Sequence, residues 1–240
     1  MYSNMGYYYG GGWGASYLLV IIGALLCLIT SGVVKGTFNK YKKIAALSGM
    51  TGAEAAAAIL HEKGIYDVRV QRVSGSLTDH FNPATKAVNL SEEVYDSTSV
   101  AALSVAAHEC GHAMQHDEGY FPLTLRSRIL PVANFGSRFG LWFVIAGLFI
   151  SFFEPLIFIG VVLFSFGVLF QLVTLPVEFD ASRRALETIR EMDILADDEM
   201  YGAQKVLKSA AMTYVASAAA SILSLIRLIL IAQGGRRSRD

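Results

Sequence analysis

The residues best suited to carry chemistry are His108, Glu109 and His112, within the run His-Glu-Cys-Gly-His. On an α-helix, side chains four positions apart lie on one face, so the two imidazoles can bind a single metal ion. Zinc binds imidazole nitrogen at about 2.0–2.1 Å and lowers the pKa of a bound water to near 7. A carboxylate between the histidines can take the proton of that water. The spacing predicts a zinc centre with Glu109 as general base.

A catalytic zinc site needs a third protein ligand and an open position. His116 lies about 12 Å further along the helix axis than His108, so it cannot reach the same ion and is expected at the surface or beside a ligand. The metzincin spacing would place a histidine at position 118, which is Glu118 here. Glu178 directly follows a long apolar run, and it fits equally a third ligand or a carboxylate favoured by the dipole at a helix start.

Four other residues are candidates for a supporting role near the metal. His80, in the turn-rich segment Leu77–Pro83, would stabilise an oxyanion or hold the turn together. Asp180 is the acid nearest to Glu178 and a candidate to orient a histidine ligand. Arg183 and Arg184 would either polarise a substrate carbonyl or form salt bridges at the membrane surface.

The composition indicates a chain that is partly embedded in lipid. Apolar residues make up 53% of it and charged residues 17%, fewer than in soluble proteins. The net charge is zero and no basic stripe with interleaved aromatic residues occurs, which argues against a nucleic-acid partner. Cys27 lies in an apolar run and Cys110 in the metal motif, so no disulfide framework is expected.

Three apolar runs account for the membrane prediction. The run 15–34 carries no charge and precedes four lysines within 35–43, which favours an anchor over a cleavable signal peptide. The run 139–175 is interrupted at Phe153–Pro155 and predicts a transmembrane helical hairpin, with a buried hairpin of a soluble core as the alternative. The run 212–232 contains Arg227 and predicts either a fourth span or a helix in the interface.

The distribution of basic residues sets the expected orientation. Lys35 onward follows the anchor, and Arg126, Arg128 and Arg138 precede the hairpin, so both positions are expected on the cytoplasmic side. We therefore expect a multi-pass protein of the cell membrane with its active site on the cytoplasmic side.

Between the anchor and the hairpin, the sequence predicts a small soluble domain. Thr51 and Glu54 form a capping box that opens an alanine-rich helix ending at Gly64. The alternating segment 66–73 and the segment 87–90 predict strands, either of which could offer an edge to a substrate. A brief helix is expected at 91–95, and a long one from Ser97 or Ser99 to near Gly119.

The expected organisation follows the chain from end to end. It comprises, in order, a flexible Tyr/Gly-rich N-terminus (1–14), a transmembrane anchor (15–34), a cytoplasmic zincin-like domain with the HExxH helix (35–138), the hairpin (139–175), a third-ligand region (176–211), the apolar helix (212–232) and a basic tail (233–240). The fold class is then an α+β membrane protein, mainly helical, with a small sheet in a zincin-like domain.

From Gly49 onward the chain resembles the bacterial membrane neutral zinc metallopeptidases of the YugP type. The matching blocks are SGMTGAEAAAAIL, GIYDVRVQRVSGSLTDHFNP, VNLSEEVYDSTSVAALSVAAHECGHAMQH and LPVEFDASRRAL. The family is similar in plan to the HtpX and CAAX prenyl protease group, and this resemblance implies one Zn²⁺ held by His108, His112 and Glu178. That group has an aspartate four residues after the ligand glutamate, where this chain has Ser182.

The expected activity is that of a membrane-bound zinc endopeptidase acting on peptides or membrane proteins through zinc-activated water. Two rivals stay open: a zinc-binding membrane scaffold without turnover, and a narrow processing protease for lipidated or transmembrane peptides. The intact Glu109 argues against the scaffold. The sequence does not fix an oligomeric state.

Overall fold

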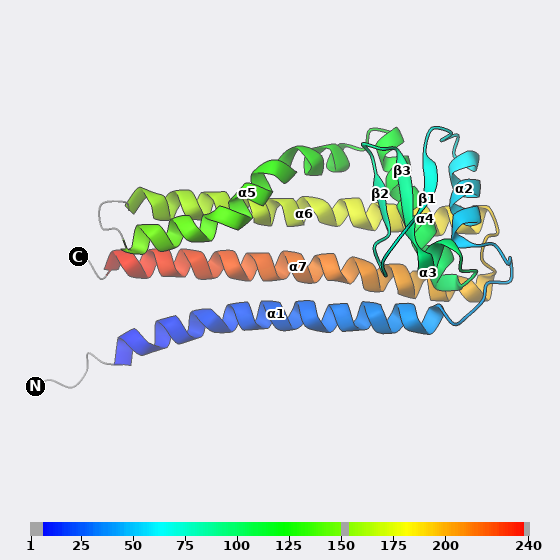
Figure 1. Cartoon of the computed structure of the whole chain (residues 1–240). Helices are drawn as coiled ribbons and strands as arrows, with labels where there is room; N and C mark the ends of the chain where they lie inside the picture. The colour runs from blue at the N-terminus through cyan, green and yellow to red at the C-terminus, as the bar shows by residue number, and fades with distance from the viewer. Residues whose placement is uncertain (1–6, 150–153, 238–240) are drawn as a thin grey trace, which may run out of the picture. The chain divides into compact units, whose positions relative to one another are not determined.

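The structure is a computed structural model that describes residues 7–149 and 154–237 (Figure 1). The chain divides into two compact units. Unit 1 comprises 1–30, 125–174 and 214–240, and unit 2 comprises 31–124 and 175–213. The four long helices each contribute residues to both units: α1 (Tyr7–Tyr41), α5 (Phe121–Phe149), α6 (Glu154–Glu191) and α7 (Asp197–Arg237).

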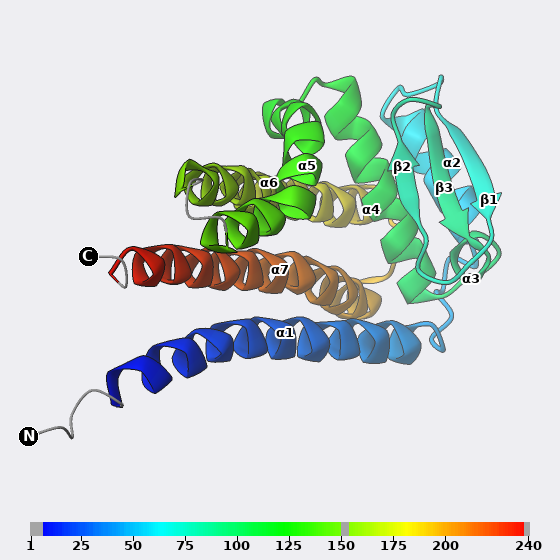
Figure 2. The same cartoon turned by 60° about the vertical axis from the view of Figure 1, so that its left-hand side comes forward.

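Unit 2 contains a three-stranded sheet built from β1 (Arg69–Val73), β2 (His80–Asn82) and β3 (Ala87–Ser91) (Figure 2). The order is β1-β3-β2, with β1 parallel and β2 antiparallel to β3. The strand predicted at 66–73 is confirmed in shortened form, and the one predicted at 87–90 is confirmed with one further residue. The prediction that 87–90 offers an edge is wrong, because every residue of β3 is buried and β3 is the middle strand.

Three helices of unit 2 pack around this sheet: α2 (Gly52–Glu62), α3 (Glu92–Tyr95) and α4 (Val100–Asp117). The capping box is confirmed, since the Thr51 side chain accepts from the Glu54 amide and the Glu54 carboxylate accepts from the Thr51 amide. Gly64 has a φ of 73°, a left-handed conformation that suits glycine after a helix. Ser99 caps α4 by accepting from the Ala102 amide.

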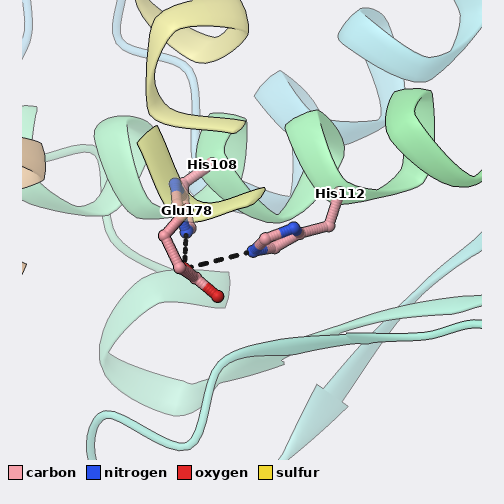
Figure 3. A group of neighbouring side chains, drawn as sticks. All are labelled: His108, His112 and Glu178. Carbon is pink, nitrogen blue, oxygen red and sulfur yellow. Dashed lines mark ion pairs between the residues drawn. The ribbon is translucent and has the colours of Figure 1, made fainter. Parts of the chain in front are cut away.

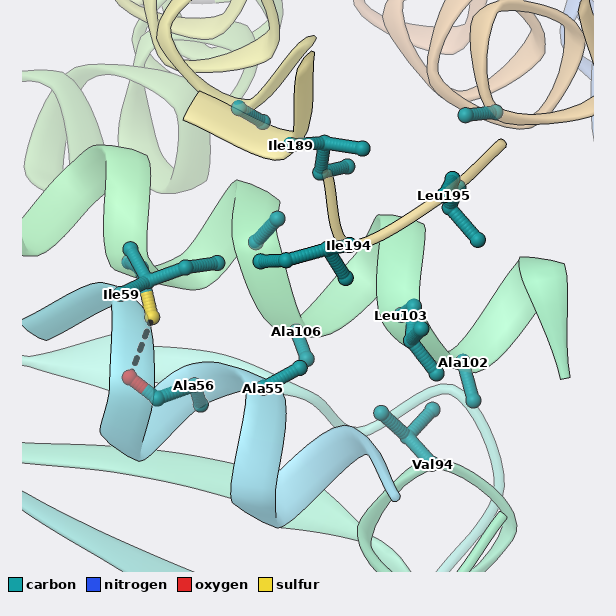
Figure 4. Close-up of a cluster of buried hydrophobic side chains, with 14 of the residues drawn as sticks. Ala55, Ala56, Ile59, Val94, Ala102, Leu103, Ala106, Ile189, Ile194 and Leu195 are labelled. Carbon is teal, nitrogen blue, oxygen red and sulfur yellow. Dashed lines mark hydrogen bonds between the residues drawn. The ribbon is translucent and has the colours of Figure 1, made fainter. Parts of the chain in front are cut away.

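The core of unit 2 forms where α2 and α4 meet the segment around 189–195 (Figure 4). Alanines on α2 and α4 bring the two helices close, and larger side chains such as Ile59, Leu103 and Ile194 fill the remaining space. The Cys110 thiol lies against the Ala56 carbonyl oxygen at 3.6 Å, and burial raises the pKa of this thiol. The helix that carries the metal motif is therefore fixed on its inner side by tight packing.

The long helices are apolar enough to cross a bilayer. Four candidate spans occur among the described residues, at Ser16–Tyr41, Phe121–Gly147, Pro155–Glu191 and Asp197–Gln233. Within unit 1, α5 and α6 meet at glycines, and a Cβ placed on Gly140 would lie 2.9 Å from the Gly160 carbonyl oxygen. Small residues of this kind allow membrane helices to approach closely. The chain is thus an α+β membrane protein, mainly helical, as predicted.

The helix boundaries differ from the expected ones. Helix α1 begins at Tyr7, so the Tyr/Gly-rich stretch expected to be flexible is helical from that residue, because adding residues to an existing helix costs little. Helix α5 begins at Phe121, well before the expected hairpin start at 139. Helix α7 runs from Asp197 and includes the whole run 212–232.

Parts of three predictions lie outside the described residues. These are the flexible N-terminus over 1–6, the hairpin turn at Phe153, and the basic tail over 238–240. The structure describes the chain again from Glu154, where α6 begins.

Candidate metal centre

Three side chains of unit 2 converge in the geometry of a metal site (Figure 3). The Glu178 Oε2 atom lies 3.4 Å from His108 Nε2 and 3.5 Å from His112 Nε2. One ligand atom from each of the three residues lies within 4.8 Å of the others. The imidazoles are half-buried and Glu178 is 2% exposed, so the donors are largely shielded from water.

These distances fit zinc. Ligands at about 2.0–2.1 Å in a tetrahedral arrangement stand about 3.3–3.4 Å apart, close to the two separations measured here. The charge also fits a cation. Burial opposes protonation of His112, yet the hydrogen bond with Glu178 and the charge of Glu109 outweigh burial and raise the pKa of this imidazole. The same negative potential favours a bound metal ion.

The approach of α6 to α4 depends on Gly111. A Cβ on this residue would lie 2.5 Å from the Ala181 carbonyl oxygen, closer than a side chain can come. A glycine inside a helix costs about 1 kcal/mol relative to alanine, and here it lets the two backbones come together. On the α6 side, Val177, Ala181 and Ala185 are fully buried at four-residue spacing. This close contact brings Glu178 to the histidines.

Glu178 does not start a helix, as the sequence suggested, because α6 continues through Pro176 to Glu191. Proline removes one backbone donor and commonly bends or ends a helix. A long helix of this kind tolerates proline where neighbouring groups restore the lost contact. Glu178 is therefore positioned by a continuous rigid helix.

Each candidate histidine ligand is oriented through its second ring nitrogen. His112 Nδ1 lies 3.0 Å from Gln115 Oε1, and His108 Nδ1 lies 3.2 Å from Ser182 Oγ. With Nδ1 donating to these oxygens, both Nε2 atoms present a lone pair toward Glu178. Ser182 thus takes the place that aspartate has in the HtpX-like group.

Gln115 links the site to α6 as well. Its amide Nε2 donates to the Val177 carbonyl oxygen at 2.8 Å and to Asp180 Oδ2 at 2.9 Å. Asp180 also accepts from Arg183 and Arg184, so an acidic residue supports His112 through a glutamine. Sequence reasoning missed Gln115, although its position three residues after His112 places it on the same helix face.

Glu109 is held by the sheet. Its Oε2 atom accepts a hydrogen bond of 2.9 Å from the Phe81 amide of β2. Nearby Asp79 accepts from the Ser91 amide and hydroxyl, and burial together with the charge of Glu109 raises the pKa of Asp79. The sequence analysis did not foresee β2, because a three-residue strand beside Asn82-Pro83 has the composition of a turn.

The other predicted site residues have structural contacts. His80 Nδ1 lies 2.9 Å from the Thr78 carbonyl oxygen and its Nε2 lies 3.3 Å from Asn89 Nδ2, as expected for a histidine that holds a turn. His116 stacks on Phe81 with ring centroids 5.6 Å apart. Arg183 pairs with Asp180 and Glu187, and Arg184 with Asp180 and Glu118, which matches the salt-bridge alternative.

Known proteins resemble this chain over most of its length. A family model described as "Putative neutral zinc metallopeptidase" matches residues 16–233. The "Putative membrane protease YugP" of Bacillus subtilis (strain 168) is 48% identical over 203 residues, covering 85% of this chain and 90% of that protein. No solved structure matches the chain. Since the family model spans nearly the whole sequence, the chain belongs to the family described as "Putative neutral zinc metallopeptidase".

Proposed function

We propose that the chain is a membrane-bound, zinc-dependent endopeptidase with Glu109 as general base. His108, His112 and Glu178 would hold the metal. The observation that supports this most directly is the clustering of three donors within 4.8 Å, with two separations close to those of a tetrahedral zinc site, beside a carboxylate that is not one of them. A site with a purely structural metal has no use for that carboxylate.

The residues around the site have different roles in the proposed hydrolysis. When bound, Zn²⁺ supplies Lewis acidity that activates water and polarises the substrate carbonyl. The Phe81 amide holds Glu109 Oε2, so Oε1 is the oxygen that takes the proton of the water and later passes it to the leaving amine. Ser182 and Gln115 keep the imidazoles in the tautomer that binds metal.

The outer edge of β2 is the proposed place for substrate. Successive amides of a strand point to opposite edges, and the Phe81 amide points to Glu109, away from β3. An extended peptide that pairs with this edge would pass beside the general base. The edge of β2 thus replaces the segment 87–90 as the proposed place for substrate. Strand β1 forms the other edge of the sheet.

The substrates would be peptides or membrane proteins, cut on the cytoplasmic side. The orientation rests on the lysines within 35–43 and on Arg126, Arg128 and Arg138. Protease protection in oriented vesicles tests it: unit 2 should resist protease added from outside and be cut once the vesicles are opened. Cleavage from outside would contradict the orientation.

Purified protein with Glu109→Gln tests the enzyme against the scaffold. We expect casein cleavage or self-cleavage to fall about 100-fold or more, with zinc content unchanged, because the amide cannot take a proton. Glu118→Gln, at the exposed end of the same helix, is the matched control and should retain activity. Equal turnover by wild type and Glu109→Gln would exclude the proposed mechanism. Absence of turnover in both, with zinc bound, would support the scaffold.

A further inference from the structure

Helix α5 has two unlike faces in unit 1. The face toward α6 consists of buried small residues, Ala133, Gly136 and Gly140. Outside this packed face the helix exposes polar and basic groups at spacings of three and four residues: Asn134 and Ser137 at its border with α6, and Arg138 on the side away from α6. A helix of a membrane unit thus displays hydrogen-bond donors outside its packed face.

These donors border a hollow of suitable size and shape for a lipid. A cavity of about 570 Å³ is lined by Asn134, Phe135, Ser137, Arg138 and Phe139. The two phenylalanine rings lie with centroids 4.8 Å apart and are 48% and 40% exposed. A smaller hollow of about 140 Å³ shares Asn134 and Ser137 and adds polar Gln171 and Ser221. Charge, hydroxyl, amide and exposed aromatic surface meet in one place.

The charge of Arg138 calls for an anion from outside the described part of the chain. Arg138 forms no ion pair or hydrogen bond with the residues that the structure describes, and helix α5 itself contains no aspartate or glutamate. Unit 1 as a whole has seven arginines against two carboxylates, Glu154 and Asp240. The planar guanidinium binds phosphate through paired hydrogen bonds, which lysine does not provide. A guanidinium binds carboxylate and phosphate alike, and in a bilayer the anion at hand is the phosphate of a lipid.

The position of Arg138 along the chain strengthens this requirement. Arg138 directly precedes the apolar run 139–175, so it is expected where the predicted hairpin enters the bilayer. The phosphates of lipids lie at that border of the hydrocarbon core. A basic side chain at the border attracts an anionic headgroup.

We propose that α5 carries a binding site for an anionic phospholipid. Arg138, Asn134 and Ser137 hold the phosphate, and the Phe135–Phe139 pair lies along the acyl chains. The ligand is a lipid of the bilayer, because the aromatic part of the hollow has no counterpart in free phosphate.

Trp142 makes the site measurable, since it lies four residues after Arg138 on the same face and is 66% exposed. The full chain with Trp13→Phe, reconstituted in phosphatidylcholine vesicles, has Trp142 as its single tryptophan. We expect brominated phosphatidylglycerol to quench its emission with an apparent affinity about fivefold above that of brominated phosphatidylcholine. Inorganic phosphate in excess should leave this preference unchanged.

Variants separate a defined site from general attraction. Arg138→Gln should abolish the preference, Arg138→Lys should reduce it, and Arg128→Gln, outside the hollow, should retain it. Asn134→Ala should weaken it without changing the charge, which keeps the test valid if Arg138→Gln is unstable. Equal quenching by the two lipids, displacement by inorganic phosphate, or equal losses in Arg138→Gln and Arg128→Gln would overturn the proposal.

Discussion

The two units of this protein satisfy the hydrophobic effect by different means. Unit 2 buries alanines and branched side chains in a core of its own, which holds the metal-binding helices in place. In unit 1, long helices leave large apolar side chains exposed, such as Leu28, Trp142 and Phe158, and meet one another at glycines. The first arrangement suits water, whereas the second needs lipid to cover what the fold leaves open.

Charge separates the units as well. The chain has no net charge, yet unit 1 has seven basic residues against two acidic, and unit 2 has thirteen basic against eighteen acidic. Every basic residue of unit 1 is arginine, while all eight lysines belong to unit 2. Whole-chain composition therefore hides the feature most relevant to partners: a cationic membrane unit and an anionic unit that contains the proposed cation site.

The largest effect is expected from replacing Glu178, one of the acidic residues of unit 2. Glu178→Ala removes the only acidic donor of the proposed zinc set, so zinc stoichiometry should fall well below one per chain and turnover should be lost. Glu187→Ala, on the same helix but exposed and paired with Arg183, should retain both. Metal analysis alongside peptide cleavage measures this. Full zinc content in Glu178→Ala would remove the third ligand from the proposal.

The next largest effect concerns the support of His112. Gln115→Ala deletes the acceptor for Nδ1 and the bonds to Val177 and Asp180. We expect zinc affinity to fall about 10- to 100-fold, because the ring loses its fixed tautomer and orientation. Competition with a chelator reports the affinity. Gln204→Ala, an exposed glutamine of α7, provides a matched control, and equal affinities of the two variants would assign Gln115 no role in the site.

A moderate effect should distinguish a glycine in a tight helix contact from a glycine on an open helix face. Gly111→Ala forces a methyl group against the Ala181 carbonyl oxygen and should destabilise the fold by about 1–3 kcal/mol. Gly32→Ala meets no atom within 4 Å and should leave stability unchanged or higher. Thermal unfolding in detergent compares them. A melting temperature of Gly111→Ala at or above that of Gly32→Ala would contradict the packing argument.

The smallest effect concerns the Cys110 thiol, which we expect to resist alkylation in the native protein. Burial raises the pKa of the Cys110 thiol, so the thiolate that would react with iodoacetamide is scarce at pH 8. We expect Cys110 to be alkylated only after denaturation, as followed by mass spectrometry of the peptide. Cys27→Ser removes the other thiol and simplifies the measurement. Rapid labelling of the native protein would show that the core around α4 opens readily.

Sequence reasoning works best where a pattern involves residues close together in the chain. The Thr51–Glu54 capping box and the His108–His112 spacing each depend on residues within one turn of a helix, and both appear as predicted. Features that depend on tertiary contacts escaped it. Ser182 contacts a histidine 74 positions away, and no local pattern reveals such a partner.

Two misjudged elements show how context overrides local preference. Pro176 has the composition of a helix end, but the packing of Val177 and Ala181 favours continuing α6. The segment His80–Asn82 has the composition of a turn, but pairing with β3 extends it into a strand. Both residues that sequence reasoning placed nearest to the chemistry depend on these elements: Glu178 on α6, and Glu109 on the Phe81 amide.

The three proposed metal ligands are synthesised in a fixed order. Two donors come from α4 and the third from α6, and the whole of α5 is translated between them. A growing chain that has emerged only as far as His112 holds an imidazole pair without its carboxylate. Synthesis of α5 and of α6 as far as Glu178 must precede completion of the proposed centre, so the chain can bind the metal with all three residues only after these segments have been made.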